Sequence, residues 1–101
     1  MTTRFEWDPD KAAANLRKHA IGFDIATRAF ADPFALSHLT AIEGGELRWQ
    51  TLGVVEGYLL LLVAHTIREE IEGGQPVEVI RIISARAADR KERERYEQES
   101  R

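Results

Sequence analysis

The stretch VIRIISARAADRKERERYEQ, residues 79–98, joins two local patterns. Its beginning is rich in Val and Ile and short enough to be a buried β-strand, whereas residues 87–99 are strong helix formers and predict a closing helix. The strand carries Arg81 in its middle and Arg86 just past its end, although buried arginines are rare. Either their aliphatic stems lie on apolar surface with the charge in water, or an open face of the sheet uses their guanidinium groups.

The residues before this stretch predict the rest of a sheet. A Gly-Gly-Gln-Pro loop within residues 72–76 folds the last strand, 77–84, back beside a strand at 58–66. The continuous apolar run in 58–66 indicates burial on both faces, so we place that strand at the centre. Residues 46–52 predict a further strand. Residues 34–45 show no clean period and predict an irregular connection, with a short strand at most at its beginning.

The N-terminal third predicts a short edge strand at residues 5–7 followed by two helices. Asp8-Pro9 marks the start of the first helix, which runs to about residue 19, because Asp is a good N-cap and Pro is tolerated at the first helical position. A second short helix is expected over residues 23–30, where Asp-Pro ends it.

The predicted order is strand, helix, helix, three strands, helix. It indicates an α+β fold with a small antiparallel sheet and helices packed mainly on one face. The other face is then free to be wet, and arginines on the strands can point to it. The 101 residues suffice for one modest core, so we expect a single domain over residues 1–101.

Composition excludes several kinds of site. The chain has no cysteine, which removes disulfides, thiol nucleophiles and Cys-ligated zinc. The three histidines lack metal-ligand spacing and there is no Gly-rich phosphate loop, so we expect neither a metal nor a cofactor. The longest apolar run, YLLLLVA at 58–64, is too short to span a bilayer, and the N-terminus has no secretory pattern. We therefore expect a cytosolic protein without membrane contact.

Charge is distributed unevenly along the chain. The net charge is −3, yet residues 81–95 carry +3 and residues 1–80 carry −5. A basic C-terminal region on an acidic body can hold an anion or dock an oppositely charged partner.

Arg68, Arg81 and Arg86 are the strongest candidates for chemistry. Hairpin pairing brings their positions close, and a fork of guanidinium groups suits a phosphate. Arg81 and Arg86 are five residues apart, so a regular strand would point them to opposite faces. A bend or bulge after Ser84, or a position of Arg86 at the entry to the helix, would reconcile them; otherwise one of the two is structural. An equally weighted alternative is that these arginines are structural and pair with nearby acids, namely Glu69, Glu70 or Glu78.

Other polar residues each have two interpretations. His19 and His65 titrate near neutrality and are candidate acid–base groups, but His19 also suits a helix C-terminal cap and His65 a hydrogen-bonded core position. Tyr96 could reach the sheet with its hydroxyl or anchor the last helix by packing.

Four segments together resemble the BrnT toxin family: FEWDPDKAAANLRKHAIGFDIATRAFADP (5–33), ELRW (46–49), HTIRE (65–69) and IRIISARAADRKERERYE (80–97). The resemblance covers nearly the whole chain. Its most specific part is the combination of an FxWDxxKAxxNxxKH opening with an RIISAR strand. The chain departs from the family pattern at Ala20, where the family usually has Gly, and in a long hairpin insert at EEIEGGQPVE.

The resemblance implies a RelE-like fold and metal-independent cleavage of RNA that inhibits translation. It also implies a ribbon-helix-helix antitoxin, through which alone the toxin would meet operator DNA, and it is compatible with a dimer within that complex. Carried onto matching positions, Arg68, Arg81 and Arg86 would form the catalytic face, while Lys18 and His19 would contact RNA. We add Tyr96 as a further candidate RNA contact because of its hydroxyl.

A second interpretation assigns the chain to a different class. It would be a non-catalytic module that binds a partner and acts only within an autorepressor complex, with the basic residues 81–95 docking an acidic segment. The acidic net charge favours this interpretation, whereas the RIISAR strand favours the ribonuclease.

Overall fold

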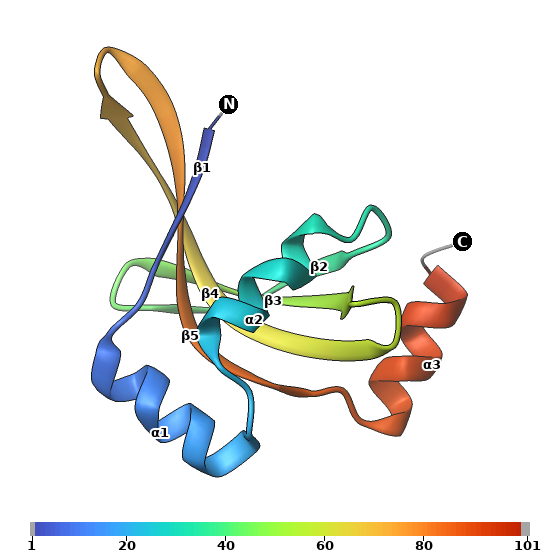
Figure 1. Cartoon of the computed structure of the whole chain (residues 1–101). Helices are drawn as coiled ribbons and strands as arrows, with labels where there is room; N and C mark the ends of the chain where they lie inside the picture. The colour runs from blue at the N-terminus through green and yellow to red at the C-terminus, as the bar shows by residue number, and fades with distance from the viewer. Residues whose placement is uncertain (1, 100–101) are drawn as a thin grey trace.

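A five-stranded β-sheet forms the centre of the computed structural model, which describes residues 2–99 (Figure 1). Helical segments lie on both of its faces. The elements in chain order are β1 (Thr2–Glu6), α1 (Pro9–His19), α2 (Phe23–Ala26), the 3₁₀ helix η1 (Thr27–Ala31), β2 (Leu36–Glu43), β3 (Glu46–Val55), β4 (Leu59–Glu72), β5 (Gln75–Ala87) and α3 (Arg90–Glu99).

The sheet is mixed, with strand order β1-β5-β4-β3-β2. Strands β2 to β5 pair antiparallel, whereas β1 pairs parallel to β5. The α+β class is therefore confirmed, and the predicted antiparallel pairing holds for β2 to β5 but was wrong for β1. The reason is that the helical segment 9–31 carries the chain from the edge that holds β1 to the opposite edge, where β2 begins, so β1 is left to pair with the last strand.

Strand β2 occupies most of the segment for which we predicted an irregular connection, so that prediction was also wrong. The register between β2 and β3 shifts at Thr40, because Leu39 pairs with Trp49 whereas Ala41 pairs with Arg48. A bulge of this kind breaks the alternation that identifies a strand in sequence. The pairing with β3 satisfies the backbone of β2 without a regular apolar pattern.

Short turns connect the last four strands, with two residues between β2 and β3 and between β4 and β5, and three residues, 56–58, between β3 and β4. Each turn has two consecutive residues at positive φ, as at Gly73 (56°) and Gly74 (78°) between β4 and β5. Turns of this twist match the twist of paired strands and are strongly favoured in hairpins. The β4–β5 hairpin is the longest and projects beyond the rest of the molecule, with β1 alongside (Figure 1).

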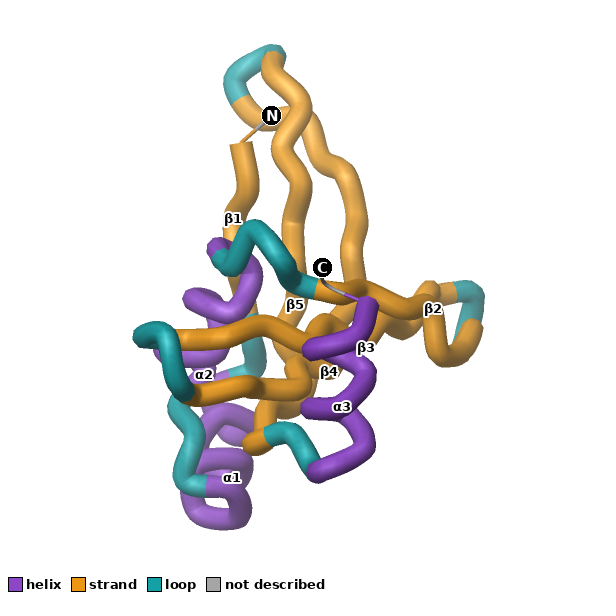
Figure 2. The backbone as a smooth tube through the Cα atoms, turned by 90° about the vertical axis from the view of Figure 1, so that its right-hand side faces the viewer, coloured by secondary structure: helices purple, strands orange, loops and turns teal. Residues whose placement is uncertain are grey.

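The two faces of the sheet are covered differently. On the first face, α1, α2 and η1 bury the larger cluster, which includes Phe23, Leu61, Val63 and Ile82. On the second face, Tyr96 of α3 and Ala88 pack against Leu52, Leu60 and Leu62. The helices therefore pack on both faces, with α3 apart from α1 and α2 (Figure 2), although most of the helical residues lie on the first. The remainder of the second face, which carries Glu6, Arg48, Arg68 and Arg81, has no helix over it; we call it the open face.

A side-chain hydrogen bond caps the start of α1, and a residue in the left-handed conformation ends it. Asp8 is the N-cap and accepts from the Asp10 amide at 2.8 Å, as predicted. The helix ends at Ala20, which adopts a left-handed conformation with φ of 59°. Asn15 is buried between α1 and β5, where its amide bonds both the N–H (3.0 Å) and the C=O (2.8 Å) of Ala85. It thereby replaces a neighbouring strand along a part of β5 that β1 does not reach.

The second predicted helix is divided in two. Residues 23–26 are α-helical and residues 27–31 are a 3₁₀ helix that ends before Asp32, where we expected the stop. The 3₁₀ turn lies directly on β3, because a Cβ atom at Gly53 would stand 2.2 Å from the Ala29 carbonyl oxygen. Among residues 2–99, no helix has the length and apolar character needed to cross a membrane.

Candidate active site on the open face

The register of the sheet places a row of polar side chains across the open face. Glu6 of β1 pairs with Arg81 of β5, Arg81 pairs with Thr66 of β4, and Thr66 pairs with Arg48 of β3. Directly paired residues share a face, so these four side chains point the same way. Arg68, two residues from Thr66, joins them. The open face therefore gathers arginines from three strands.

Arg68 and Arg81 converge on one carboxylate, that of Glu6. Arg68 donates from Nη1 to Oε2 (2.8 Å) and from Nη2 to Oε1 (3.0 Å), and Arg81 donates from Nη1 to Oε2 (3.1 Å). We predicted that these arginines could converge on one anion, and in this structure the anion is a side chain of the protein itself.

Further ion pairs extend this cluster. Arg68 also donates from Nε to Glu70 (2.6 Å), and Arg4 lies 3.0 Å from Glu70 and 2.9 Å from Glu72. The stems of Arg4 and Arg68 flank Val79, which is fully buried although it lies on this face. The structural interpretation therefore describes Arg68 as it stands in this structure, since its stem covers apolar surface and its charge is paired with Glu70, one of the acids we named.

Hydrogen bonds from the arginines make Glu6 strongly acidic. Donation from Arg68, followed by that from Arg81, lowers the pKa of Glu6 from 4.5 to about 2, against the opposing effect of burial. The pKa of Arg68 is raised by its hydrogen bonds to Glu6 and Glu70. Glu6 and Arg68 are therefore both ionised at neutral pH.

Arg86 lies on the same face but belongs to a different contact. A bulge at Ile83, which is left without a partner between the Ala64–Ser84 and His65–Ile82 pairs, reverses the alternation and turns Arg81 and Arg86 to one face. We expected such a bulge after Ser84; it precedes Ser84 by one residue.

The guanidinium group of Arg86 binds both carboxylate oxygens of Glu92, at 2.8 and 2.9 Å. This hydrogen bonding raises the pKa of Arg86 and lowers that of Glu92. Glu92 also accepts from the Asp89 amide while Asp89 accepts from the Glu92 amide, which is a capping box at the start of α3. The structure brings Arg68 and Arg81 together and holds Arg86 at the entry to α3.

Lys18 and His19 border a pocket of about 230 Å³ between α1 and β5. Its lining also includes Lys11, Ile83 and Ser84. Ser84 lies between Arg81 and Arg86 on β5 and pairs with Ala64, so the register assigns it to the same face as both arginines. The lysines of α1 therefore stand next to the strand that carries the arginines.

His65 lies in the core on the opposite face. It is 1% exposed, its Nε2 is 2.7 Å from the Thr51 hydroxyl, and its ring meets the Phe30 ring edge-on at 4.8 Å between centroids. Burial lowers the pKa of His65 to about 4, so the ring is neutral at physiological pH. In this structure it is separated from Arg81 by the sheet itself.

Tyr96 is engaged in packing and in a hydrogen bond. Its ring lies against the Leu52 cluster, and its hydroxyl donates to Oδ2 of Asp32. Burial, together with this hydrogen bond, raises the pKa of Tyr96 to about 12. An RNA contact by the hydroxyl would require it to leave Asp32.

Sequence reasoning missed Glu6, Arg48 and the role of Asn15. Glu6 could have been found from the alternation of residues 5–7 only if the parallel pairing of β1 with β5 had been known. The Nε atom of Arg48 is buried without a hydrogen-bond partner among the described residues, and its nearest acid is Glu43 at 3.7 Å. Asn15 lies within the FxWDxxKAxxNxxKH motif, and its contacts show that this position serves the fold.

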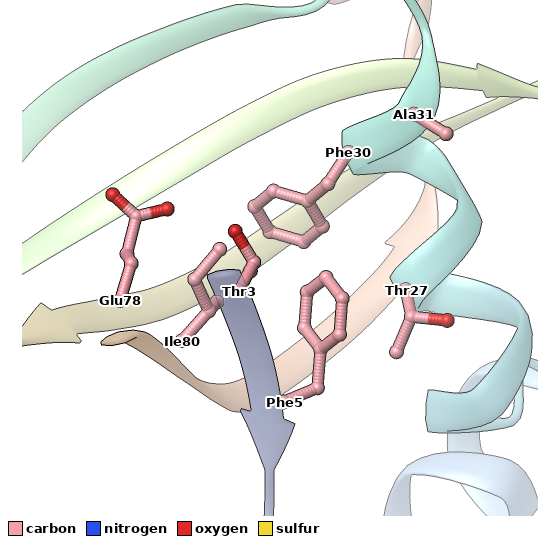
Figure 3. Close-up of a pocket in the computed structure, with 7 residues that line it drawn as sticks. All are labelled: Thr3, Phe5, Thr27, Phe30, Ala31, Glu78 and Ile80. Carbon is pink, nitrogen blue, oxygen red and sulfur yellow. The ribbon is translucent and has the colours of Figure 1, made fainter. Parts of the chain in front are cut away.

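A second pocket, of about 320 Å³, lies on the helix-covered face and is drawn in Figure 3. The rings of Phe5 and Phe30 stand side by side in it, 5.4 Å apart between centroids, and Glu78 is its one charged lining residue. The pocket offers no convergent set of polar groups. Within residues 2–99, no three His, Cys, Asp or Glu side chains are arranged to hold a metal ion.

Comparisons with known proteins identify the family. Residues 7–92 match the family model described as the ribonuclease toxin BrnT of type II toxin–antitoxin systems. The chain also matches the 1.1 Å crystal structure of the Brucella abortus ribonuclease toxin BrnT, with a TM-score of 0.62 and 22% identity, covering 89% of this chain and 100% of that one. At this identity the structural match shows a common fold. A comparison with curated proteins found no match. Since the family model spans most of the chain, the protein belongs to the BrnT family of ribonuclease toxins of type II toxin–antitoxin systems.

Proposed function

We propose that this protein is a metal-independent endoribonuclease that cleaves RNA and inhibits translation, with Arg68 and Arg81 binding the phosphate that is cleaved. The observation that carries the proposal is the convergence of both guanidinium groups on one carboxylate at 2.8 to 3.1 Å. A phosphate oxygen accepts hydrogen bonds from the same donors in the same geometry. The arginines keep their charge at every working pH.

Cleavage of RNA by its own 2′-hydroxyl needs no nucleophile from the protein, so the main requirement is that the protein stabilise the negative charge on the phosphate. Attack by a ribose 2′-hydroxyl on the adjacent phosphate produces a pentavalent state with more negative charge on its oxygens. Fixed guanidinium groups favour that state, because they need not reorganise when the charge develops. Arg68 and Arg81 would supply this stabilisation without a metal ion.

The surrounding cations suggest the path of the RNA. Arg86 lies further along the same face as Arg81, and Lys18 and His19 border the pocket beside Ser84. Neighbouring phosphates of a bound strand would meet these groups. Arg86 can contribute once Glu92 gives up part of its bidentate contact. The Tyr96 hydroxyl is held by Asp32 and is given no RNA contact in this proposal.

The test combines growth and cleavage. We expect expression of the wild-type chain to arrest growth and the purified protein to cleave RNA in the presence of EDTA. We expect Arg81→Ala to abolish both while retaining the fold by circular dichroism. The matched control is Arg28→Ala, since Arg28 is exposed and, among the described residues, pairs only with Glu56 in the turn after β3. A folded Arg81→Ala protein that still cleaves RNA would overturn the assignment.

The partner implied by the family is an antitoxin. We infer an antitoxin of ribbon-helix-helix type that neutralises the toxin in the cytoplasm, touches operator DNA itself and can hold two toxin copies. Co-expression should restore growth, and the mass of the purified complex by light scattering gives its stoichiometry. The proposal fails if the neighbouring gene product neither binds this chain nor relieves the arrest.

A second function has one observation in its favour. Arg68, Arg81 and Arg86 are all paired with carboxylates, as expected for a structural surface in a non-catalytic docking module. Under that function the wild-type chain would be harmless when expressed alone and would leave RNA intact. The same growth and cleavage assays therefore decide between the two.

A further inference from the structure

Glu6 forms ion pairs with arginines from three strands, and two of these arginines are the ones that the proposed function assigns to phosphate. Arg68 reaches it from β4, Arg81 from β5, and Arg4 of its own strand lies 3.5 Å away. Glu70 and Glu72 share Arg68 and Arg4 with it. Among the described residues, Glu6 is the one carboxylate bound by both Arg68 and Arg81.

A bound phosphate and Glu6 would compete for the same donors. Three of the N–H groups that would bind the phosphate now point to the two oxygens of Glu6. The carboxylate cannot move far when it is displaced, because the Glu6 backbone is fixed by its pairing with Arg81 at the end of β1. A phosphate in this position would therefore have a free carboxylate beside it.

We propose that Glu6 is the general base of the reaction and that the incoming phosphate releases it from the two arginines. The inference rests on the proposed function. As the O2′–P bond forms and the P–O5′ bond breaks, the proton of the 2′-hydroxyl passes to the Glu6 carboxylate. The leaving O5′ takes a proton from solvent water, and Glu6 returns its proton to solvent. The products are a 2′,3′-cyclic phosphate and a 5′-hydroxyl end.

The release changes how basic Glu6 is. In the free protein, hydrogen bonds from Arg68 and Arg81 lower its pKa to about 2, at which a carboxylate is a poor proton acceptor. When a phosphate takes those donors, the pKa of Glu6 rises back toward 4.5. Arg4 then remains the cation nearest to it, as the partner of Glu70 and Glu72. The base is thus strengthened only when substrate is present.

The experiment separates binding from cleavage in Glu6→Gln, which keeps the size of the side chain and removes its charge and basicity. Binding is measured with a 2′-O-methyl RNA oligonucleotide, which cannot be cleaved, and cleavage is measured with the same sequence as RNA. We expect cleavage to fall by about 100-fold or more. We expect the 2′-O-methyl oligonucleotide to bind more tightly, because the arginines lose their internal competitor.

The matched control is Glu72→Gln. It makes the same change of charge on the same face, but Glu72 contacts Arg4 and neither arginine of the proposed phosphate site. Cleavage and binding should both stay near the wild-type values. Glu6→Asp keeps a carboxylate and should retain part of the cleavage, so it tests the inference should Glu6→Gln fold poorly.

The outcomes of these experiments distinguish a failure of this inference from a failure of the proposed function on which it rests. Faster cleavage by Glu6→Gln would show that the carboxylate only competes with phosphate, and weaker binding would show that it only positions the arginines; either would overturn its role as base. A wild-type protein that cleaves no RNA would overturn the proposed function itself, and the inference with it.

Discussion

Ala20 ends α1 in a backbone conformation that alanine disfavours. Its φ of 59° lies in the left-handed region, where the Cβ atom crowds the backbone and glycine is preferred. The side chain is exposed and contributes nothing to the core.

We therefore expect Ala20→Gly to raise the free energy of unfolding by about 1 kcal/mol, and with it the melting temperature by about 4–8 °C. Thermal denaturation followed by circular dichroism measures this. Ala13→Gly is the matched control, because residue 13 is exposed within α1 and glycine there should destabilise the helix by about 1 kcal/mol. Equal effects of the two substitutions would show that the backbone at residue 20 is unstrained.

Glu6 also links stability to pH. Its pKa is lowered on folding, so the stability it provides is present above 4.5 and is lost as the pH falls toward about 2. We expect the urea midpoint of the wild type to fall more steeply across this acid range than that of Glu6→Gln. Asp32 and Glu92 also have lowered pKa values, but they are common to both proteins and cancel in the difference. Parallel pH profiles would mean that the arginines do not bind Glu6 in solution.

At the level of elements, the sequence predicted what depends on neighbouring residues. Asp8 and Pro9 start α1 because capping is local, and the apolar run of β4 identified the central strand. The errors concern pairing between distant segments. The bulge at Thr40 concealed β2, and the pairing of β1 with β5 joins residues more than seventy positions apart.

The candidate site was predictable in part for the same reason. Arg68 and Arg81 were found from the hairpin that carries both. The direction of Arg86 depended on a bulge at Ile83 whose position the sequence does not mark. Glu6 was missed because its neighbours come from strands far along the chain, and no pattern within residues 2–6 indicates them.

The attachment of α3 gives a prediction about that helix. No residue of α3 is fully buried, and the helix is held by the packing of Tyr96, by its bond to Asp32 and by the Arg86–Glu92 pair. Tyr96→Phe keeps the ring and leaves Asp32 with the amides of Phe34 and Val54. We expect a loss of about 1 kcal/mol in the free energy of unfolding, with RNA binding unchanged.

Urea denaturation and binding of the 2′-O-methyl oligonucleotide measure these two quantities. Tyr58→Phe, in the exposed β3–β4 turn, is the control and should change neither. If Tyr96→Phe weakened RNA binding without a change in stability, its hydroxyl would be an RNA contact and would exchange Asp32 for the substrate.

At the scale of the whole molecule, basic residues are concentrated in one part of the chain, residues 81–95, although the protein as a whole has a negative net charge. The net charge of −3 opposes RNA at long range, so binding must come from a few direct phosphate contacts. If Arg68 and Arg81 hold one phosphate and Arg86 and Lys18 hold two more, the logarithm of the association constant should fall with the logarithm of salt concentration with a slope of about −2. Arg86→Ala should reduce the magnitude of the slope by about 0.7. An unchanged slope would remove Arg86 from the phosphate contacts.

The parallel pairing of β1 with β5 has a consequence for the time course of synthesis. Chains emerge from the ribosome N-terminus first, and the three hairpins can form as soon as their neighbouring strands are available. Strand β1 is made first, yet its partner β5 is the last strand to appear. Glu6 therefore cannot form its ion pairs with both Arg68 and Arg81 until residue 81 has been synthesised. For most of the time that its synthesis takes, the nascent chain on the ribosome therefore lacks the assembled cluster of Glu6, Arg68 and Arg81.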